Sequence, residues 1–310
     1  MKSIKVPILI IAFNRPEVTR DTFEFIKKAK PEKIYIAVDG HRENVPGEKE
    51  KVEEVKNILS DITWKCSVQY KFNESNRGAE ITVSSAISWV LEREENVIIL
   101  EDDIIAPWGF LKFAEEMLIK YQDNEQIATV TGSNFTPIPF PNNEDYCFAR
   151  YGHSWGWATW RRAWKDFDLN LSVKPEHLRM DFLRTVTVNE REAKFLKKQF
   201  LKLMHKGPGN STWDYTANYF LRVNNKLSII PRVNLTSNIG IYGLHARGKT
   251  QHHFRPYDEN FKATKHPSEV AYFREFDQFH FDNYISLKRP LSIRTLKKLK
   301  RIIKSIYSGD

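Results

Sequence analysis

Cysteine is scarce in this sequence, which has only Cys66 and Cys147 among its 310 residues. Two cysteines cannot build a disulfide-stapled scaffold or a cysteine-rich zinc module, so both classes are excluded. Long hydrophobic runs are absent too, because no stretch approaches the roughly 18 uncharged apolar residues that a membrane-spanning helix needs. The apolar run near the start is broken by Asn14-Arg15-Pro16 and is too short and wrongly flanked for a secretory signal. We therefore expect a cytoplasmic protein.

The excess of positive charge is confined to one end of the chain. The sequence has 48 Lys and Arg against 39 Asp and Glu, a net charge of +9. Eight of the basic residues lie between 288 and 304, and the single acid of that tail is Asp310. The remaining body holds 40 basic and 38 acidic residues, a net charge of only +2. This balance does not indicate a nucleic-acid-binding surface, and we predict no nucleic-acid partner.

The tail at 288–310 has the pattern of a basic amphipathic helix. After Pro290, apolar residues recur at steps of three and four, and basic residues fill much of the remainder. Such a helix suits an anionic membrane surface, and we favour peripheral association with the inner face of a membrane. The alternative is a helix that docks on the body of the protein through its apolar face.

Strand-like and helix-like segments alternate through the first 131 residues. Apolar runs of strand length are Val6–Phe13, Ile34–Val38, Ser67–Phe72, Val97–Leu100 and Ile127–Thr131, and helical spacing falls at Glu17–Lys30, Glu48–Leu59, Ala79–Leu91 and Phe110–Tyr121. This alternation predicts an α/β fold with a mostly parallel, Rossmann-like sheet flanked by helices. Further on we expect helical structure over 178–205 and 213–223 and a strand over 227–230. No boundary precedes about residue 288, so we predict a single domain over 1–287.

Polar residues follow three of these runs, at the strand ends where parallel sheets bind ligands. Glu101-Asp102-Asp103 is a cluster of like charges that needs a positive partner, and Mg²⁺ or Mn²⁺ against a substrate phosphate would supply it. The alternative is an acidic turn ahead of a helix. Arg15 and Asp39 suit a phosphate and a ribose, but on the pattern alone a solvated arginine and an Asp-Gly turn are the better explanation.

An aromatic block lies in the second half, where five of the eight tryptophans fall between 155 and 213. Flat indoles suit the apolar faces of sugar rings, and we expect Trp155 or Trp157 to line a sugar pocket. Trp160 and Trp164 have helical spacing and are assigned to packing.

Three segments together resemble the nucleotide-sugar glycosyltransferases of the GT-A fold: residues 8–16 (ILIIAFNRP), 38–41 (VDGH) and 98–103 (IILEDD). The chain is similar both to the bacterial sugar transferases often labelled hemolytic-protein-like and to the eukaryotic N-acetylglucosaminyltransferase I. Residues 153–164, 212–215 and 231–240 look like later blocks of the bacterial group. The resemblance covers about residues 5 to 250.

The resemblance implies a role for each matching residue. Asp39 would bind the uracil or ribose, with Arg15 and Arg77 in the same nucleotide pocket. Glu101 and Asp102 would contact the donor sugar and ribose, and Asp103 would hold the metal against the diphosphate.

Trp157 and Trp213 would also bind the nucleotide sugar, by lining its sugar pocket, and Asp214 would be the catalytic base. The eukaryotic enzyme follows its Trp-Asp pair with a second Asp and a Trp, whereas Tyr215 and Thr216 follow here. Several GT-A enzymes use a late histidine at the metal or diphosphate, which implies His245, with His252 or His253 as alternatives.

The function implied is an inverting, metal-dependent transfer of a sugar, with an N-acetylhexosamine as one candidate, from a UDP-sugar to a glycan or lipid-linked acceptor. Bacterial surface polysaccharide or glycoconjugate synthesis is the expected setting, with a nucleotide-binding half at about 1–135 and an acceptor half at about 136–287. One alternative is a sugar-nucleotide nucleotidyltransferase, although residues 12–16 lack its glycine-rich basic loop. Another is a non-catalytic module that binds glycans or polyanions.

Overall fold

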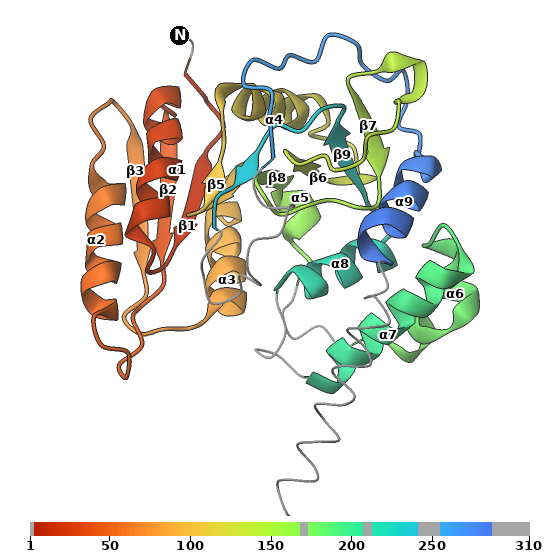
Figure 1. Ribbon diagram of the computed structural model, residues 1–310, viewed down its shortest axis with the longest axis horizontal. Coiled ribbons are helices and arrows are strands. Elements are labelled where there is room, and N and C mark those ends of the chain that lie inside the picture. The colour runs from red at the N-terminus through yellow and green to blue at the C-terminus, as the bar shows by residue number, and fades with distance from the viewer. Residues whose placement is uncertain (1–2, 168–172, 207–212, 241–254, 287–310) are drawn as a thin grey trace, which may run out of the picture.

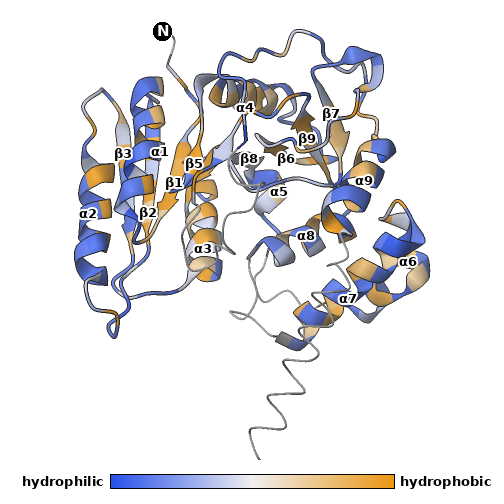
Figure 2. Cartoon of the chain, in the orientation of Figure 1, coloured by the Kyte–Doolittle hydropathy of each residue, from blue (hydrophilic) through white to orange (hydrophobic). Residues whose placement is uncertain are grey.

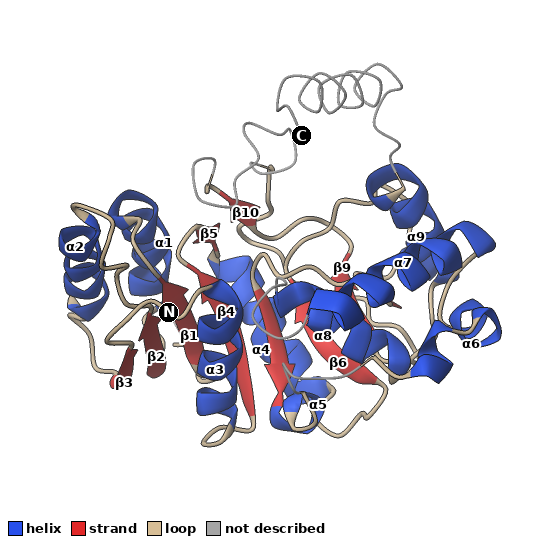
Figure 3. Ribbon diagram, turned by 90° about the horizontal axis from the view of Figure 1, so that it is seen from below, coloured by secondary structure: helices blue, strands red, loops and turns tan. Residues whose placement is uncertain are grey.

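The computed structural model describes residues 3–167, 173–206, 213–240 and 255–286 (Figure 1). Within these ranges, eight strands form one sheet in the order β3-β2-β1-β4-β8-β6-β9-β7, and β10 pairs with β5 in a second, small sheet. Strands β3, β2, β1 and β4 are parallel, as are β6 and β9, whereas β8 and β7 run antiparallel to their neighbours. Helices cover both faces (Figures 1 and 3). The predicted α/β class, with a mostly parallel, Rossmann-like sheet flanked by helices, is confirmed.

The strands are β1 (Ile8–Ala12), β2 (Lys33–Val38), β3 (Ser67–Phe72), β4 (Asn96–Glu101), β5 (Ile104–Ile105), β6 (Ile127–Thr131), β7 (Tyr146–Ala149), β8 (Trp157–Trp160), β9 (Leu227–Pro231) and β10 (Ser237–Asn238). The α-helices are α1 (Pro16–Ala29), α2 (Glu48–Ser60), α3 (Ala79–Leu91), α4 (Trp108–Lys120), α5 (Arg161–Trp164), α6 (Met180–Thr185), α7 (Glu190–Lys206), α8 (Trp213–Val223) and α9 (Arg274–His280).

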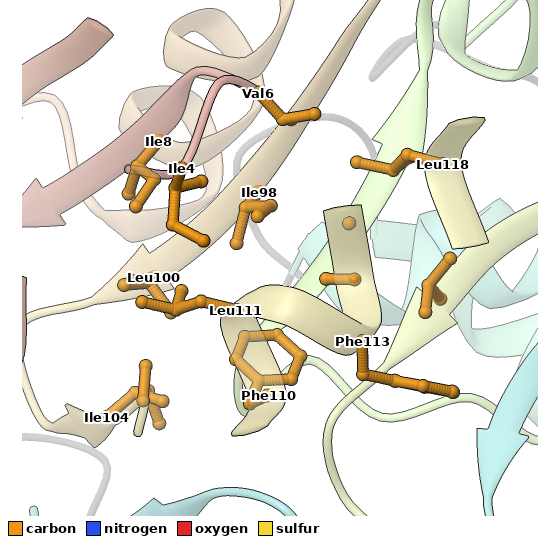
Figure 4. Packing of buried hydrophobic residues seen from close by; sticks show 14 of the residues in the cluster. Ile4, Val6, Ile8, Ile98, Leu100, Ile104, Phe110, Leu111, Phe113 and Leu118 are labelled. Atoms are coloured by element: carbon orange, nitrogen blue, oxygen red, sulfur yellow. The ribbon is translucent and has the colours of Figure 1, made fainter. Parts of the chain in front are cut away.

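The central strands are buried on both faces, which explains their continuous apolar runs. Ile8 and Ile10 of β1 belong to the core that α1, α2 and α4 cover, while Leu9 and Ile11 point to the opposite core under α3. Figure 4 shows the first of these cores, where Phe110 and Leu111 of α4 lie against the sheet. Figure 2 shows that apolar residues are concentrated in the buried strand β1, whereas many residues of α2 and α7 are hydrophilic.

The second half of the chain differs from the prediction in two places. Trp160 ends strand β8 and does not lie in a helix, although it is buried and its indole N–H donates to the carbonyl of Leu118, so the packing role is correct. The expected helical stretch over 178–205 is two helices, because the Asn189 side chain accepts a hydrogen bond from the backbone N–H of Glu192 and begins α7 there.

None of the described helices is long and apolar enough to cross a bilayer. The basic tail at 288–310 lies outside the described residues, as do His245, His252 and His253. The membrane contact and the histidine ligand therefore stay predictions.

Candidate functional site

A cleft opens at the carboxyl ends of β1, β2 and β4, and we call it the acidic cleft. The chain leaves β1 toward β2 and β3 and then returns to the other side of β1 for β4, so the strand order reverses at this point. Ligands of open parallel sheets bind at such reversals. The cleft has a volume of about 860 Å³ and is lined by residues that include Phe13, Asn14, Arg15, Asp39, Arg42, Asn76, Glu101, Asp102, Asp103, Trp155, Asn238 and Gly240.

The positive partner that the acidic triplet needs is Arg15. Its guanidinium contacts the carboxylate of Asp102 and lies 2.8 Å from Asp103 Oδ2. Burial acts to lower the pKa of Arg15, but the attraction of Asp102 and Asp103 outweighs it and raises that pKa. Arg15 lies three residues after β1, and Asp102 and Asp103 directly follow β4, so the parallel pairing of these two strands brings the groups together.

One guanidinium does not neutralise three carboxylates. Removal from water, with the charges of Asp103 and Asp102 nearby, raises the pKa of Glu101 to about 8. Removal from water also raises the pKa of Asp102 to about 6, although Arg15 opposes the shift. In both groups the ionised form is disfavoured, and a cation bound beside these carboxylates would favour it.

A short segment from the second half closes the cleft over Asp103. Pairing of β10 with β5 sets Asn238 opposite Ile104, and the Asn238 side chain donates to Asp103 Oδ1 at 3.3 Å. Gly240 lies so close that a Cβ built there would come within 2.8 Å of both Arg15 Nη1 and Asp103 Cγ. Only glycine fits this position without displacing the ion pair.

Asp39 lies in the cleft, and its carboxylate is already hydrogen-bonded to neighbouring residues. Its two oxygens accept hydrogen bonds from the side chains of Asn73 and Asn76, each at 2.9 Å, and from the backbone N–H groups of Gly40, Arg77 and Gly78, each at 3.0 Å. A carboxylate has about four lone-pair sites, so these donors fill it. Asp39 thus fixes the 73–78 loop, and its contact with a nucleotide stays a prediction. Arg77 supplies its backbone N–H here, and its side chain is exposed.

The sequence analysis missed a second ion pair in the cleft. Glu48, at the start of α2, accepts hydrogen bonds from Arg42 Nε at 3.0 Å and from the Asn14 side chain at 2.7 Å. The Arg42 contact lowers the pKa of Glu48 to about 2, so this carboxylate stays ionised. Arg42 lies two residues after Gly40, close to the end of β2. This position after a strand end is the sequence feature that could have indicated Arg42.

The described residues contain no group of three or more His, Cys, Asp or Glu side chains arranged to hold a metal ion. Magnesium-type sites use one or two protein carboxylates and complete their shell with water and substrate phosphate. The clustered oxygens of Asp102 and Asp103 fit such a cation, whose charge would also favour ionisation of Glu101.

A second hollow, which we call the tryptophan cavity, lies between the sheet and helices α7 and α8. Its volume is about 320 Å³. Trp157 of β8 stacks on Trp213 at the start of α8, with ring centroids 5.5 Å apart and planes inclined by 17°. Asp214 follows Trp213, is exposed, and lines the same cavity. The structure thus places Trp157, Trp213 and Asp214 together but not in the acidic cleft, where Trp155 is the tryptophan present.

A charge in the tryptophan cavity acts on a residue of the acidic cleft. The negative charge of Asp214 is among the groups that raise the pKa of Glu101, so the predicted base acts across the gap on the acidic triplet. Trp155 of the acidic cleft packs at 5.4 Å on Phe135, which in turn packs at 4.4 Å on His153 of the tryptophan cavity. A molecule that reached from one hollow to the other would therefore meet both sets of predicted residues.

The sequence matches no protein-family model and no curated protein. Among solved structures, a mannosyltransferase from Pyrobaculum calidifontis in complex with GDP-Man and Mn²⁺ is 14% identical, covers 72% of each chain and has a TM-score of 0.37. Mouse xyloside xylosyltransferase 1 is 12% identical over 72% of this chain and 84% of that one, with a TM-score of 0.38. A cytidylyltransferase from Leptospira borgpetersenii is 12% identical over 64% and 73%, with a TM-score of 0.34. At these values the similarity is distant and does not identify an activity.

Proposed function

We propose that the protein is an inverting glycosyltransferase that binds a nucleotide sugar in the acidic cleft and an acceptor in the tryptophan cavity. The observation that carries this proposal is the placement of two separate acidic sites side by side. The triplet with Arg15 lies at the strand-order reversal, and Asp214 lies close enough to act on Glu101. One site suits a diphosphate and the other an acceptor hydroxyl.

Each residue of the acidic cleft has its own role in this proposal. Asp39 holds the 73–78 loop against the nucleotide side of the cleft. Arg15 is placed to share its charge between the carboxylates and a diphosphate. A divalent cation held by Asp103, with Asp102 beside it, would stabilise the charge that develops on the leaving nucleotide. Only the sequence resemblance supports uracil as the base.

Asp214 is proposed as the general base. It would take the proton from the acceptor hydroxyl as that oxygen attacks the anomeric carbon of the donor, and the bond to the nucleotide breaks in the same displacement. Asp214 is exposed at the first turn of α8, where a carboxylate is favoured by the helix dipole and is free to meet a substrate.

The test measures binding and transfer separately. Thermal shifts with UDP, GDP, CDP and dTDP, each with and without Mn²⁺, should show one nucleotide that stabilises the protein more strongly with the metal. Asp214→Asn should keep that shift but lose nucleotide release from the matching nucleotide sugar in the presence of acceptor. Asp181→Asn, an exposed acid paired with Arg179, is the matched control and should keep both.

Two results would count against the proposal. Full turnover by Asp214→Asn removes Asp214 from the mechanism. Release of pyrophosphate from a nucleoside triphosphate and a sugar phosphate would assign the acidic cleft to a nucleotidyltransferase.

A further inference from the structure

Strand β3 forms an uncovered edge of the eight-stranded sheet. It is the last strand in the sheet order, and its pairing with β2 runs over six residues without a bulge (Figure 3). Tyr70 and Phe72 of this strand are 45% and 38% exposed, and their rings pack together with centroids 5.3 Å apart. A regular edge strand with exposed apolar side chains is a template for pairing with another strand.

The opposite edge of the same sheet, strand β7, is covered. All four residues of β7 are buried, and Phe148 forms a bridge with Tyr272 from a later part of the chain. The carbonyl of Phe148 also accepts a hydrogen bond from the backbone N–H of Phe273 at 2.8 Å. Just before β7, the backbone N–H of Asp145 donates to the carbonyl of Lys265 at 2.8 Å. The chain thus protects one edge and leaves the other open, and β3 has no proline to block it.

Lysine is another residue that protects edge strands, and β3 contains Lys71. The Lys71 ammonium lies 5.8 Å from the ring centroid of Trp89 in α3. Trp89 in turn packs on Tyr35 of β2 with ring centroids 5.1 Å apart. The lysine is therefore drawn back over the face of the sheet and does not block the edge of β3.

The backbone of β3 presents unpaired groups at this edge. The backbone N–H groups of Ser67 and Asn73, at the two ends of the strand, donate hydrogen bonds toward β2 at 2.9 and 3.0 Å. In a parallel ladder, alternate residues bond to the same neighbouring strand. The residues between them that direct their N–H and C=O groups away from β2 are therefore Val68, Tyr70 and Phe72.

We propose that β3 binds a second copy of this chain, with the two β3 strands antiparallel about a two-fold axis at Tyr70. In this register Tyr70 faces Tyr70 of the other copy, and Val68 faces Phe72. Each outward-facing backbone group then has a partner, because three pairs that exchange two bonds each give about six main-chain hydrogen bonds. A shift by two residues in either direction would set Val68 or Phe72 opposite a position outside β3.

The charges that flank the strand favour the same arrangement. Lys65 precedes β3 and Glu74 follows it, and both side chains are exposed. Antiparallel pairing brings Glu74 of each copy next to Lys65 of the other, whereas parallel pairing would bring like charges together. This complementarity lies between two copies of the same segment, so it favours a second copy over an unrelated strand. Because β7 is covered, the pairing closes at two copies and builds no filament.

The pairing leaves both acidic clefts open. In an antiparallel arrangement the carboxyl ends of the strands point in opposite directions in the two copies, so the clefts lie at opposite ends of the joined sheet. Dimer formation goes beyond the proposed function and does not depend on it, and each can fail without the other.

Sedimentation velocity of the full chain tests the dimer. Pairing through one strand buries a small area, so we expect a reversible dimer at micromolar concentrations. Tyr70→Lys sets like charges opposite one another at the axis and should raise the dimer dissociation constant at least about tenfold. Ile119→Lys is the matched control, because Ile119 is a 63% exposed side chain of α4, and it should leave the dimer unchanged.

Cross-linking tests the register with Tyr70 and Phe72 in place. Cys66 is first replaced in Cys66→Ser, and Cys147 is buried. In this background Gln69→Cys and Lys71→Cys would lie directly opposite each other across the axis, so a mixture of the two variants should form a disulfide under a mild oxidant. Either variant alone should not, because its two copies of the same position lie about 7–8 Å apart, beyond the reach of a disulfide.

The cross-link decides the matter even if Tyr70→Lys fails to fold. No disulfide in the mixture, or disulfides equally strong in either variant alone, overturns the inference. A dimer that folded Tyr70→Lys leaves intact overturns it too and places the contact on another surface. A wild-type chain that stays monomeric at every concentration is the remaining contrary result.

Discussion

Replacement of Arg15 by methionine tests whether the guanidinium holds the acidic cleft together. Methionine keeps most of the apolar stem but removes the charge between Asp102 and Asp103. The side chains of these carboxylates are only 5% and 10% exposed, whereas Arg15 is 27% exposed. Removal of one partner from a buried ion pair costs about 3–5 kcal/mol, and because water reaches Arg15 we expect about 2–3 kcal/mol here.

The measurement is urea denaturation at pH 7 in EDTA, followed by circular dichroism. Arg20→Met is the matched control, since Arg20 pairs with Glu54 on the surface, where the two side chains are 53% and 50% exposed. That variant should change the free energy of unfolding by less than about 0.5 kcal/mol. A divalent cation should then replace the lost charge, so Mn²⁺ should stabilise Arg15→Met more than the wild type.

The reasoning is refuted by either of two outcomes. Arg15→Met as stable as Arg20→Met would mean that the ion pair contributes no net stability. An equal Mn²⁺ effect on Arg15→Met and wild type would mean that the carboxylates do not attract the cation, and the charge argument for a metal would fail with it.

Three further predictions concern other parts of the two hollows. Gly240→Ala should abolish the nucleotide-induced thermal shift while the urea midpoint falls only modestly, because the new Cβ would displace Asp103; an unaltered shift would contradict the close packing. Asp39→Ala should cost about 2 kcal/mol in urea denaturation by leaving the donors of the 73–78 loop unpaired, and no loss would show that this loop is ordered otherwise. In the folded protein the pKa of His153 is lowered from 6.5 to about 4. Between these two pH values the unfolded chain binds more protons than the folded protein, so stability falls as the pH drops through this window. Relative to His153→Phe, wild type should lose about 2–3 kcal/mol between pH 6.5 and 4.5, and parallel pH profiles would be the contrary result.

The sequence predicted the first half of the fold well because its signals are local. The central strands are buried on both faces and are read as apolar runs, and the intervening helices carry the helical period. The bounds predicted for Ser67–Phe72 and Ala79–Leu91 are those of β3 and α3. Strand β8 was missed because it has only four residues and pairs antiparallel with β4 and β6, a contact that no local pattern reports.

The candidate site was predicted only in part for a similar reason. Strand ends pointed to Arg15, Asp39 and the acidic triplet, and the sheet does bring these residues into one cleft. That Arg15 is the counter-charge, and that the 73–78 loop fills the carboxylate of Asp39, depends on contacts between residues 34 to 88 positions apart. The tryptophan cavity joins β8 to α8 across more than 50 residues, so spacing alone could not separate it from the cleft.

The contrast in charge between the two hollows bears on how a donor can bind. Glu101, Asp102 and Asp103 place three carboxyl groups around the single positive charge of Arg15, while Arg42 is already paired with Glu48. A nucleotide diphosphate brings further negative charge, and like charges a few ångströms apart in a partly dry cleft repel strongly. Arg15 alone cannot offset this repulsion, so we expect the proposed donor to bind only together with a divalent cation. The described lining of the tryptophan cavity has no cluster of carboxylates, so acceptor binding there should be indifferent to chelators when the donor is absent.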